Sequence, residues 1–286
     1  MRPTDASYAP GQRPDGTTAH PTRYGELSGG EQDMAERGTA RTRVRAGTRT
    51  GPSGAAVGSA DWWRGRYALR DRRRARPGGL TLDAITATAL RIADDEGLDA
   101  LTMRAVADRL SVRHTSLYRH VASREELLVE LVDHMLGEIR LPGPGRGWRA
   151  GTESGAREYR RVLLAHRALV PLLPRGQLLG PNALRAREAG LRLLVEAGWP
   201  AERAVRIYLT VTHYVVGAVV LDTGGAARTA ARRAAMADLF ASLPAGRHPL
   251  VTAHSALLGG PDGDDEFDFG LRCLLDGIAS TREDRP

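Results

Sequence analysis

The sequence contains no lysine and a single cysteine. All 41 basic residues are arginine, which we attribute to a GC-rich coding bias rather than to chemistry. The single cysteine, Cys273, excludes an intrachain disulfide. Because it lies in an apolar helical stretch, LRCLLDGI, we expect it to be a buried core thiol.

Long apolar runs are also missing. No stretch reaches the roughly 18 apolar residues that a membrane-spanning helix needs, and the best candidate, residues 207–221, is interrupted by Thr and His. We expect this segment to be a buried helix and the chain to have no membrane partner. The amino end lacks a charged leader followed by an apolar run, so we expect no secretory signal and a cytoplasmic location.

Motifs of catalytic and metal sites are absent as well. No His and Cys residues have zinc spacing, and no glycine-rich phosphate loop occurs. Residues 259–268, GGPDGDDEFD, lack the twelve-residue ligand pattern of a calcium loop, and we expect them to form a polar loop before the final helix. We therefore expect no enzyme, no metal site and no cofactor.

The positive charge is concentrated in the first 79 residues. They hold 15 Arg against 8 acids, a net charge of +7, whereas residues 80–286 hold 26 Arg and 26 acids. Residues 1–79 are rich in Gly, Pro, Ser and Thr, so we expect a disordered basic extension. Its last part, Arg70–Arg76, either adds sequence-independent phosphate contacts or is inert. Asp61-Trp62-Trp63 is its one apolar cluster, compatible with a short helix docked on the body.

Residues 102–124, TMRAVADRLSVRHTSLYRHVASR, have the pattern of two short helices joined by a tight turn. Thr102 can cap the first helix, whose apolar residues Ala105, Val106 and Leu110 fall at helical intervals. Ser111 and Val112 form the break. In the second helix, Leu117 and Val121 share the face that points at the first helix.

The opposite face of the second helix is polar and basic. The segment from Leu101 to Arg124 holds five Arg against one acid, a local charge of +4. A helix of this kind fits the major groove of DNA, where Arg can read guanine and hydroxyls or rings can contact other base edges and phosphates. The face consists of Arg113, His114, Thr115, Ser116, Tyr118, Arg119 and His120.

Helices are predicted on both sides of this pair. Ile85, Ala89 and Ile92 form a helical stripe that Gly97 ends. After the pair, Ser123 and Glu126 form a capping box that opens a connecting helix. The whole run from Leu82 to Met135 closely resembles the DNA-binding domain of the tetracycline-repressor (TetR) family. The matching positions are Gly97, Thr102, Ala105-Val106-Ala107, Val112, Leu117-Tyr118-x-His120-Val121 and the following Ser-x-x-Glu-Leu-Leu.

The resemblance implies which side chains contact DNA. Arg104, His114, Thr115 and Ser116 match base-contacting or groove-facing positions, and Tyr118, His120 and Arg124 match positions that contact phosphate or nearby bases. Arg119 replaces an aromatic residue of the tetracycline-binding members, so its partner is open. Tyr118 could instead pack partly buried with only its hydroxyl at a phosphate, and His120 could make a structural hydrogen bond.

The carboxyl-terminal part is also helical in pattern, so we expect an all-α protein. Candidate helices run from Trp148 to Ala165, Pro181 to Ala197, Pro200 to Asp222, Pro249 to Leu258 and Glu266 to Ser280. We divide the chain into the extension 1–79, a three-helix DNA-binding domain with the helix-turn-helix at 80–126, and a helical-bundle regulatory domain for ligand binding and dimerisation at 127–286. The resemblance implies a homodimer that packs through its final helices.

The resemblance extends, more weakly, to the regulatory domain. Where tetracycline-binding members hold magnesium–tetracycline with polar side chains, this chain has Gly155, Gly190, Leu221 and an apolar stretch near Leu172. A hard cation needs oxygen or imidazole ligands. We therefore predict that the chain does not bind magnesium–tetracycline.

The remaining pocket is predicted to be apolar with a few polar groups. Its candidate ligand-binding residues are Arg140, Tyr159, Arg175, His213 and Val216. His213 could equally be a core histidine, and Arg140 a surface charge.

The sequence thus predicts a ligand-responsive repressor that binds a palindromic DNA operator as a homodimer and is released by a small hydrophobic effector. The alternative is a DNA-architectural or scaffold protein without an effector. Such a protein would spread its positive charge rather than concentrate it.

Overall fold

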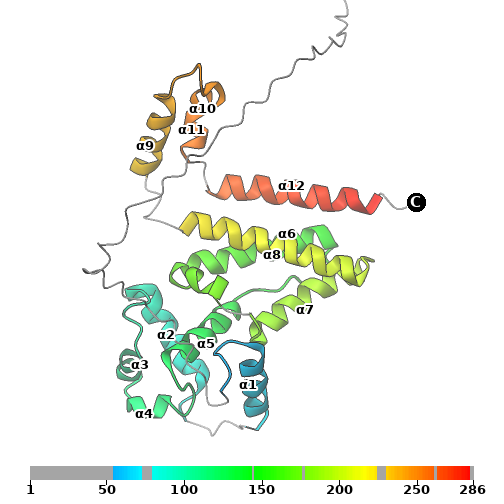
Figure 1. The fold of residues 1–286 in the computed structure, drawn as a ribbon. Helices are drawn as coiled ribbons and strands as arrows, with labels where there is room; N and C mark the ends of the chain where they lie inside the picture. Colours follow the sequence, from blue (N-terminus) through cyan, green and yellow to red (C-terminus); the bar gives the residue numbers. More distant parts are fainter. Residues whose placement is uncertain are drawn as a thin grey trace, which may run out of the picture. The chain divides into compact units, whose positions relative to one another are not determined.

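The structure, a computed structural model, describes residues 54–72, 79–143, 145–175, 178–223, 230–260 and 263–283. No strand occurs in these ranges, so the expected all-α fold class is confirmed (Figure 1). The helices are α1 Ala60–Arg72, α2 Leu82–Glu96, α3 Met103–Arg109, α4 His114–Leu117, α5 Arg124–Leu136, α6 Trp148–Ala165, the 3-10 segment η1 Arg167–Arg175, α7 Pro181–Glu196, α8 Ala201–Thr223, α9 Ala230–Ala241, α10 Pro249–Ala253, α11 Ser255–Leu258 and α12 Gly263–Glu283.

Hydroxyl caps set the start of α2, α3 and α5. The side-chain oxygens of Thr81, Thr102 and Ser123 accept hydrogen bonds from backbone N–H groups three residues on, at 3.1, 3.0 and 3.2 Å. Each bond satisfies a donor that the helix itself leaves unpaired. The expected cap at Thr102 and the Ser123 half of the capping box are therefore confirmed.

The turn between α3 and α4 is tight. Ser111 has φ 53°, in the left-handed region that side chains other than glycine rarely adopt. α4 is a single turn that ends at Leu117, shorter than expected, and turns follow at residues 118–120. Leu117 and Val121 are nevertheless both fully buried, so the predicted inner face of this segment is correct.

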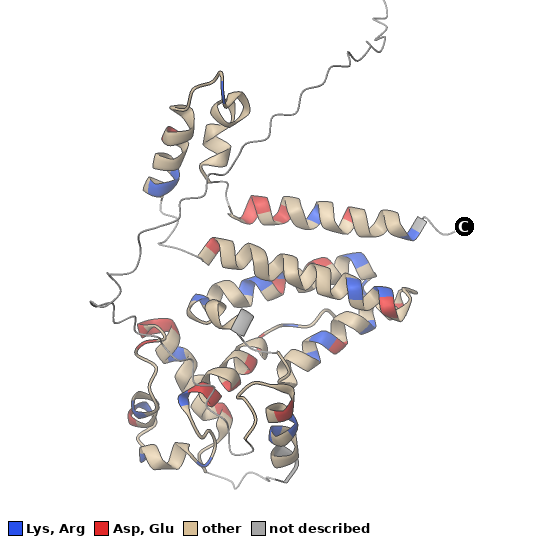
Figure 2. Cartoon of the chain, in the orientation of Figure 1, with Lys and Arg blue, Asp and Glu red and all other residues tan. Residues whose placement is uncertain are grey.

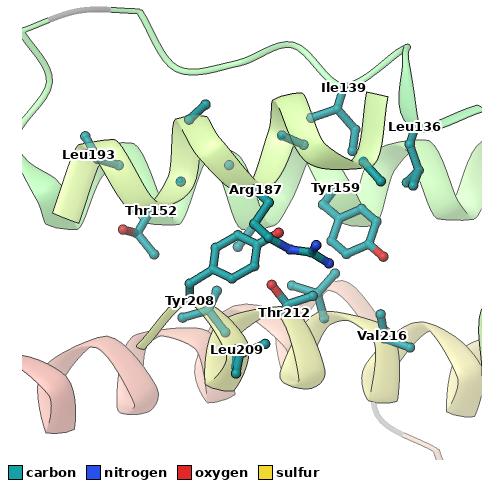
Figure 3. A pocket seen from close by; sticks show the side chains of 18 of the residues that line it. Leu136, Ile139, Thr152, Tyr159, Arg187, Leu193, Tyr208, Leu209, Thr212 and Val216 are labelled. Carbon is teal, nitrogen blue, oxygen red and sulfur yellow. The ribbon is translucent and has the colours of Figure 1, made fainter. Parts of the chain in front are cut away.

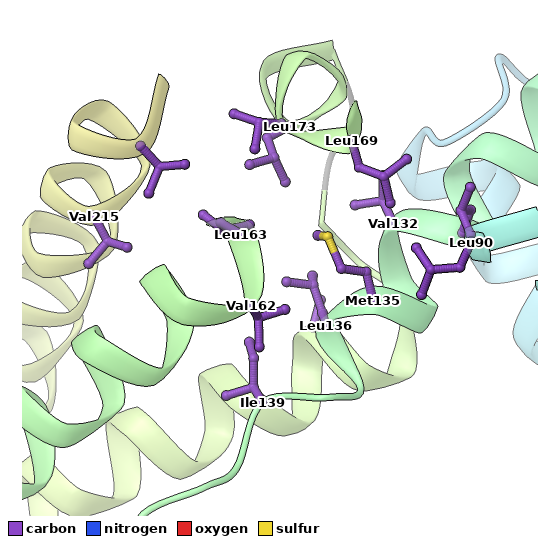
Figure 4. Close-up of a cluster of buried hydrophobic side chains, with 14 of the residues drawn as sticks. Leu90, Val132, Met135, Leu136, Ile139, Val162, Leu163, Leu169, Leu173 and Val215 are labelled. Atoms are coloured by element: carbon purple, nitrogen blue, oxygen red, sulfur yellow. The ribbon is translucent and has the colours of Figure 1, made fainter. Parts of the chain in front are cut away.

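α5 belongs to both halves of the protein. It packs against α2 on one side and against α6, η1 and α7 on the other. Leu127 and Leu131 are fully buried in the first half of the helix, and Met135 and Leu136 enter the cluster with Leu163 in the second half (Figure 4). The boundary that we drew after residue 126 therefore falls inside a continuous helix.

The regulatory part is built around α8. α6, α7, η1 and α12 all pack against this 23-residue helix. Its length and mean hydropathy would suffice to cross a membrane, but Ile207, Val211, Val215 and Val219 form a buried stripe in the protein core. This stripe is one face of α8, whereas Leu209 and Leu221 on the same helix are exposed, so the expected buried helix is confirmed for that face alone.

Three local expectations were wrong. The expected disorder up to residue 79 was wrong for residues 60–72, which form α1, whereas the short docked helix considered at Trp62-Trp63 is confirmed. Cys273 is exposed, because it lies on the face of α12 opposite Leu271 and Leu275, which are fully buried. The acidic stretch at 264–266 forms the first turn of α12 rather than a loop, where negative side chains favour the helix dipole.

A histidine links the two halves. At the end of α6, His166 Nδ1 lies 2.8 Å from Asp94 Oδ2 of α2, and Nε2 lies 3.0 Å from Glu138 Oε2, just after α5. Burial disfavours the charged imidazole, but the hydrogen bonds to Glu138 and Asp94 outweigh it, so the pKa of His166 lies above its usual value. The ring therefore joins α2 to the regulatory part, and these contacts favour its protonated form.

We expect the free energy of unfolding to fall as pH rises through the pKa of His166. The stabilisation is complete below the unfolded-state pKa of roughly 6.5 and is lost above the raised folded-state value. Gln does not titrate, so His166→Gln should flatten this dependence at pH values above the unfolded-state pKa of roughly 6.5. Urea unfolding checks this, and identical pH profiles for the parent and the variant would contradict it.

Candidate functional site

The first candidate site is the exposed face of α3 and α4. The Arg104 side chain on α3 is 88% exposed, with Asp108 at 3.7 Å on the same helix. On α4 and the turn after it, His114, Thr115, Tyr118 and Arg119 are exposed, while Ser116 and His120 are half-buried. Five of the eight predicted DNA-binding side chains are therefore exposed on the helix-turn-helix, and Ser116 and His120 are partly accessible.

The rings on this face lie beside each other. The ring centroids of His114 and Tyr118 are 6.0 Å apart in an edge-to-face arrangement. Tyr118 is 48% exposed, so its partial burial leaves ring and hydroxyl accessible. The buried Leu117 between them anchors the turn, which holds the polar side chains outward.

Arg124 occupies a different environment from the one we expected. Its Nε donates to the carbonyl of Leu101 at 2.7 Å, and its Nη2 donates to the carbonyl of Leu98 at 2.6 Å. These bonds tie the start of α5 to the segment before α3. The structure thus gives Arg124 a role in positioning the helix-turn-helix, which its sequence position did not indicate.

The regulatory part differs from the basic helix-turn-helix in its distribution of charge. Basic and acidic side chains are mixed along its helices, and many form ion pairs (Figure 2). Arg157, for example, contacts both Glu153 and Asp268. This mixture agrees with the neutral composition of residues 80–286.

The second candidate site is a cavity of about 560 Å³ between α6, α7 and α8 (Figure 3). Its wall is mostly aliphatic, and no acidic residue lines it among the described residues. The polar groups in the wall belong to Thr152, Tyr159, Arg187, Tyr208, Thr212 and His213. The cavity lies within the size range of small-molecule sites.

Small residues open the space in the cavity. Gly190 on α7 allows close approach of the Tyr208 ring, because an added Cβ would lie 2.9 Å from two ring carbons. Gly155 also lines the cavity, and an added Cβ there would meet nothing within 4 Å. Gly155 and Gly190, two of the positions where we expected chelating groups to be missing, therefore face the cavity. Leu221, a third such position, is 67% exposed on α8.

Tyr159 is the most unusual polar group in the cavity. Its hydroxyl is buried and has no hydrogen-bond partner among the described residues. Burial, and to a smaller extent the neighbouring Tyr208, raises the pKa of Tyr159, so the hydroxyl stays protonated. An unsatisfied buried hydroxyl costs free energy, which a ligand group in hydrogen-bond reach would recover.

The structure places the other predicted ligand-binding residues in different environments. Val216 lines the cavity, and His213 lies exposed at its mouth rather than in the core. Arg140 instead lines a separate polar groove of about 580 Å³, next to Arg157 and Arg161. The side chain of Arg175, and those of the basic run Arg70–Arg76, lie outside the described residues.

Sequence reasoning missed Arg187. Its side chain points into the cavity beside Tyr159 and Tyr208 (Figure 3), and its Nη2 donates to the carbonyl of Leu178 at 3.3 Å. Ala183, Arg187 and Gly190 share one face of α7, at helical spacing. A polar residue within a stripe of small residues was the signal that could have identified it.

The chain matches two family models. The model described as "Bacterial regulatory proteins, tetR family" matches residues 85–131. The model described as "Tetracyclin repressor-like, C-terminal domain" matches residues 141–282. Together they cover the helix-turn-helix, the cavity and α12.

Individual proteins agree with this match. The chain is 35% identical to the HTH-type transcriptional repressor DrrR1 of Streptomyces coeruleorubidus over 260 residues, 85% of this chain and 95% of the relative. It is 30% identical to the class A tetracycline repressor protein of Escherichia coli, over 70% of this chain and 91% of that protein. The crystal structure of ActR of Streptomyces coelicolor in complex with actinorhodin has 33% identity and a TM-score of 0.65, over 71% of this chain and 97% of ActR.

Proposed function

Because the chain belongs to the TetR family of bacterial regulatory proteins, we propose that the exposed side chains of α3 and α4 contact its operator and that its cavity binds a polycyclic aromatic effector. The chain is a DNA-binding transcriptional regulator of the repressor type, and the family binds operator DNA as dimers. A regulator of this kind works where the chromosome is, so we place it in the bacterial cytoplasm. An architectural protein without an effector would not need the cavity.

The exposure pattern of α4 supports the assignment of the DNA contacts. Leu117 and Val121 are fully buried while the side chains between and before them face outward. Such a face can enter the major groove, where hydroxyls, rings and guanidinium groups contact base edges and phosphates. We assign operator contact to Arg104, His114, Thr115, Ser116, Tyr118, Arg119 and His120. We propose that Arg124 supports this face through its hydrogen bonds to the backbone carbonyls of Leu98 and Leu101.

Exposed apolar side chains on α8 and α12 support the assignment of the dimer interface. Leu209 and Leu221 on α8 are 41% and 67% exposed, and Phe269 on α12 is 58% exposed. The two helices pack against each other within one chain. A second copy that covers both would bury these side chains and set two recognition helices about one DNA turn apart, as a palindromic operator requires.

The cavity supports the assignment of the effector class. Two tyrosine rings and aliphatic side chains favour flat apolar rings, while Tyr159, Arg187 and Thr212 offer hydrogen bonds to carbonyl, hydroxyl or carboxylate groups. ActR, which is 33% identical to this chain, binds actinorhodin in its crystal structure. The described lining residues include no acid, and His213 is their one imidazole, so a hard cation would lack a set of protein ligands.

The position of α5 explains how an effector would release the protein from its operator. Filling the cavity moves α7, which packs against α5, and α5 carries the helix-turn-helix at its other end. A changed distance between the two recognition helices costs contacts at one half-site. The effector therefore weakens operator binding without touching DNA.

We expect Arg104→Ala combined with Tyr118→Ala to abolish operator binding while the dimer stays intact. Both side chains are exposed, so their removal deletes DNA contacts without disturbing the core. An operator selected from a random DNA pool with the parent protein serves for gel-shift measurements, and size-exclusion chromatography checks the dimer. Retained sequence-specific binding by the double variant would show that the assigned face is wrong.

We expect actinorhodin to release the selected operator, and Tyr159→Phe to raise the concentration needed by roughly fivefold, since one hydrogen bond of about 1 kcal/mol is lost. Tyr214→Phe is the matched control, because the Tyr214 hydroxyl donates to the carbonyl of Phe267 at 2.8 Å and does not line the cavity. Tetracycline with magnesium should leave the operator bound. Release by that mixture, or equal responses of the two Tyr variants, would contradict the assigned chemistry of the cavity.

A further inference from the structure

α1 lies before the first residue that either family model matches. It is nevertheless docked on the protein. Trp62 and Trp63 are each only 2% exposed, and Gly58 lies against Val129 of α5, where an added Cβ would be 3.2 Å from a methyl carbon. Residues that bury two indole rings need a specific surface to receive them, and α5 supplies part of it.

The buried acids of α5 hold α1 in place. The indole Nε1 of Trp62 donates to Glu126 Oε1 at 3.2 Å, and Arg66 Nε donates to Glu130 Oε1 at 2.7 Å. The side chain of Glu130 is only 2% exposed and that of Arg66 only 14%. A buried carboxylate is costly unless it is paired, so these bonds stabilise the two acids of α5 and favour the docking of α1.

α1 also contacts the recognition segment, by which we mean α4 and the turn after it, residues 114–121. Arg66 Nη1 donates to the carbonyl of His120 at 3.0 Å, at the end of the turn that follows α4. The same guanidinium thus joins Glu130 of α5 to the backbone of the proposed DNA-contacting face. Bonds from one planar, rigid group to two elements fix the angle between them.

A third contact reaches the regulatory part. The Tyr67 hydroxyl donates to the carbonyl of Leu179 at 2.5 Å, two residues before α7. α7 lines the cavity through Ala183, Arg187 and Gly190. Tyr67 therefore contacts the segment that leads directly into α7, the helix whose residues would contact an effector.

The start of α7 has little room to move independently. Asp133 of α5 accepts from the backbone N–H of Ala183 at 3.0 Å, and a Cβ added at Gly180 would lie 2.1 Å from the Asp133 side chain. A shift of this turn must therefore displace the groups that touch it. Those groups are Asp133 on α5 and Tyr67 on α1.

We propose that α1 is an interdomain clamp. It connects the segment before α7 to the recognition segment, in addition to the connection through α5. It thereby holds the helix-turn-helix in its DNA-binding orientation. The expected effect of the clamp on operator binding rests on the function proposed above. The clamp consists of Trp62, Arg66 and Tyr67. Effector-driven motion of α7 reaches the recognition segment through both α5 and this clamp.

Arg66→Gln and Tyr67→Phe test the clamp in the full chain, with Arg64→Gln as the matched control. Arg64 lies on the same helix, but its side chain is 76% exposed and pairs only with Asp61 among the contacts resolved for it. We expect roughly tenfold weaker operator binding for Arg66→Gln, about threefold for Tyr67→Phe and no change for Arg64→Gln. The salt dependence of Kd should be the same in all, because Arg66 is bound to Glu130 and the His120 carbonyl rather than to phosphate.

Several outcomes would overturn the proposal. Equal effects of Arg66→Gln and Arg64→Gln, or a salt slope that falls by about one in Arg66→Gln, would show that α1 acts as a phosphate contact. If Arg66→Gln fails to dimerise, Tyr67→Phe decides, because it removes one hydroxyl only. Parent-like operator binding by Tyr67→Phe would then exclude the link to α7.

Hydrogen exchange separates the clamp from the DNA function. We expect faster amide exchange at residues 118–121 in Arg66→Gln and at residues 181–184 in Tyr67→Phe, with neither change in Arg64→Gln. If the parent selects no DNA from a random pool, the proposed function fails while this readout still tests the clamp. Unchanged exchange in both clamp variants would overturn the proposal.

Discussion

Three acidic side chains buried on α5 constrain the rest of the structure. Glu126, Glu130 and Asp133 are 2 to 4% exposed, and a carboxylate in that environment must be paired. Glu126 accepts from the indole of Trp62 on α1 and from the backbone N–H of Ala122 at 2.8 Å, Glu130 binds Arg66 of α1, and Asp133 caps α7. α5 is therefore fixed both to α1 and to the helix that lines the cavity.

This arrangement explains how one chain can couple two distant sites. Apolar contacts alone would let α7 slide over α5, because they are not directional. The Asp133 cap prevents such sliding, since hydrogen bonds to a charged group depend on geometry and are costly to break. His166 adds a further link from α6 to α2, so that the helix-turn-helix and the regulatory part are held at more than one point.

Local signals in the sequence predicted much of the fold. The caps at Thr102 and Ser123 and the buried pair Leu117 and Val121 depend on residues three or four apart, so periodicity and capping rules detect them. The contacts of Trp62 and Arg66 join positions about 60 residues apart, which no local pattern encodes. For the same reason the sequence indicated an apolar cavity with Tyr159 but not that Arg187 enters it or that Arg140 lies outside.

The central claim is that occupation of the cavity sets the distance between the two recognition helices. It can be tested without a ligand by Gly155→Trp, which fills the cavity from α6 at a position where an added Cβ meets nothing within 4 Å, with Gly155→Ala as the control that adds one methyl group. Spin labels at Asp99→Cys in a Cys273→Ser background report the distance across the dimer by pulsed electron paramagnetic resonance. We predict a displaced distance distribution for Gly155→Trp and a parent-like one for Gly155→Ala. A parent-like distribution in a folded Gly155→Trp dimer would contradict the account.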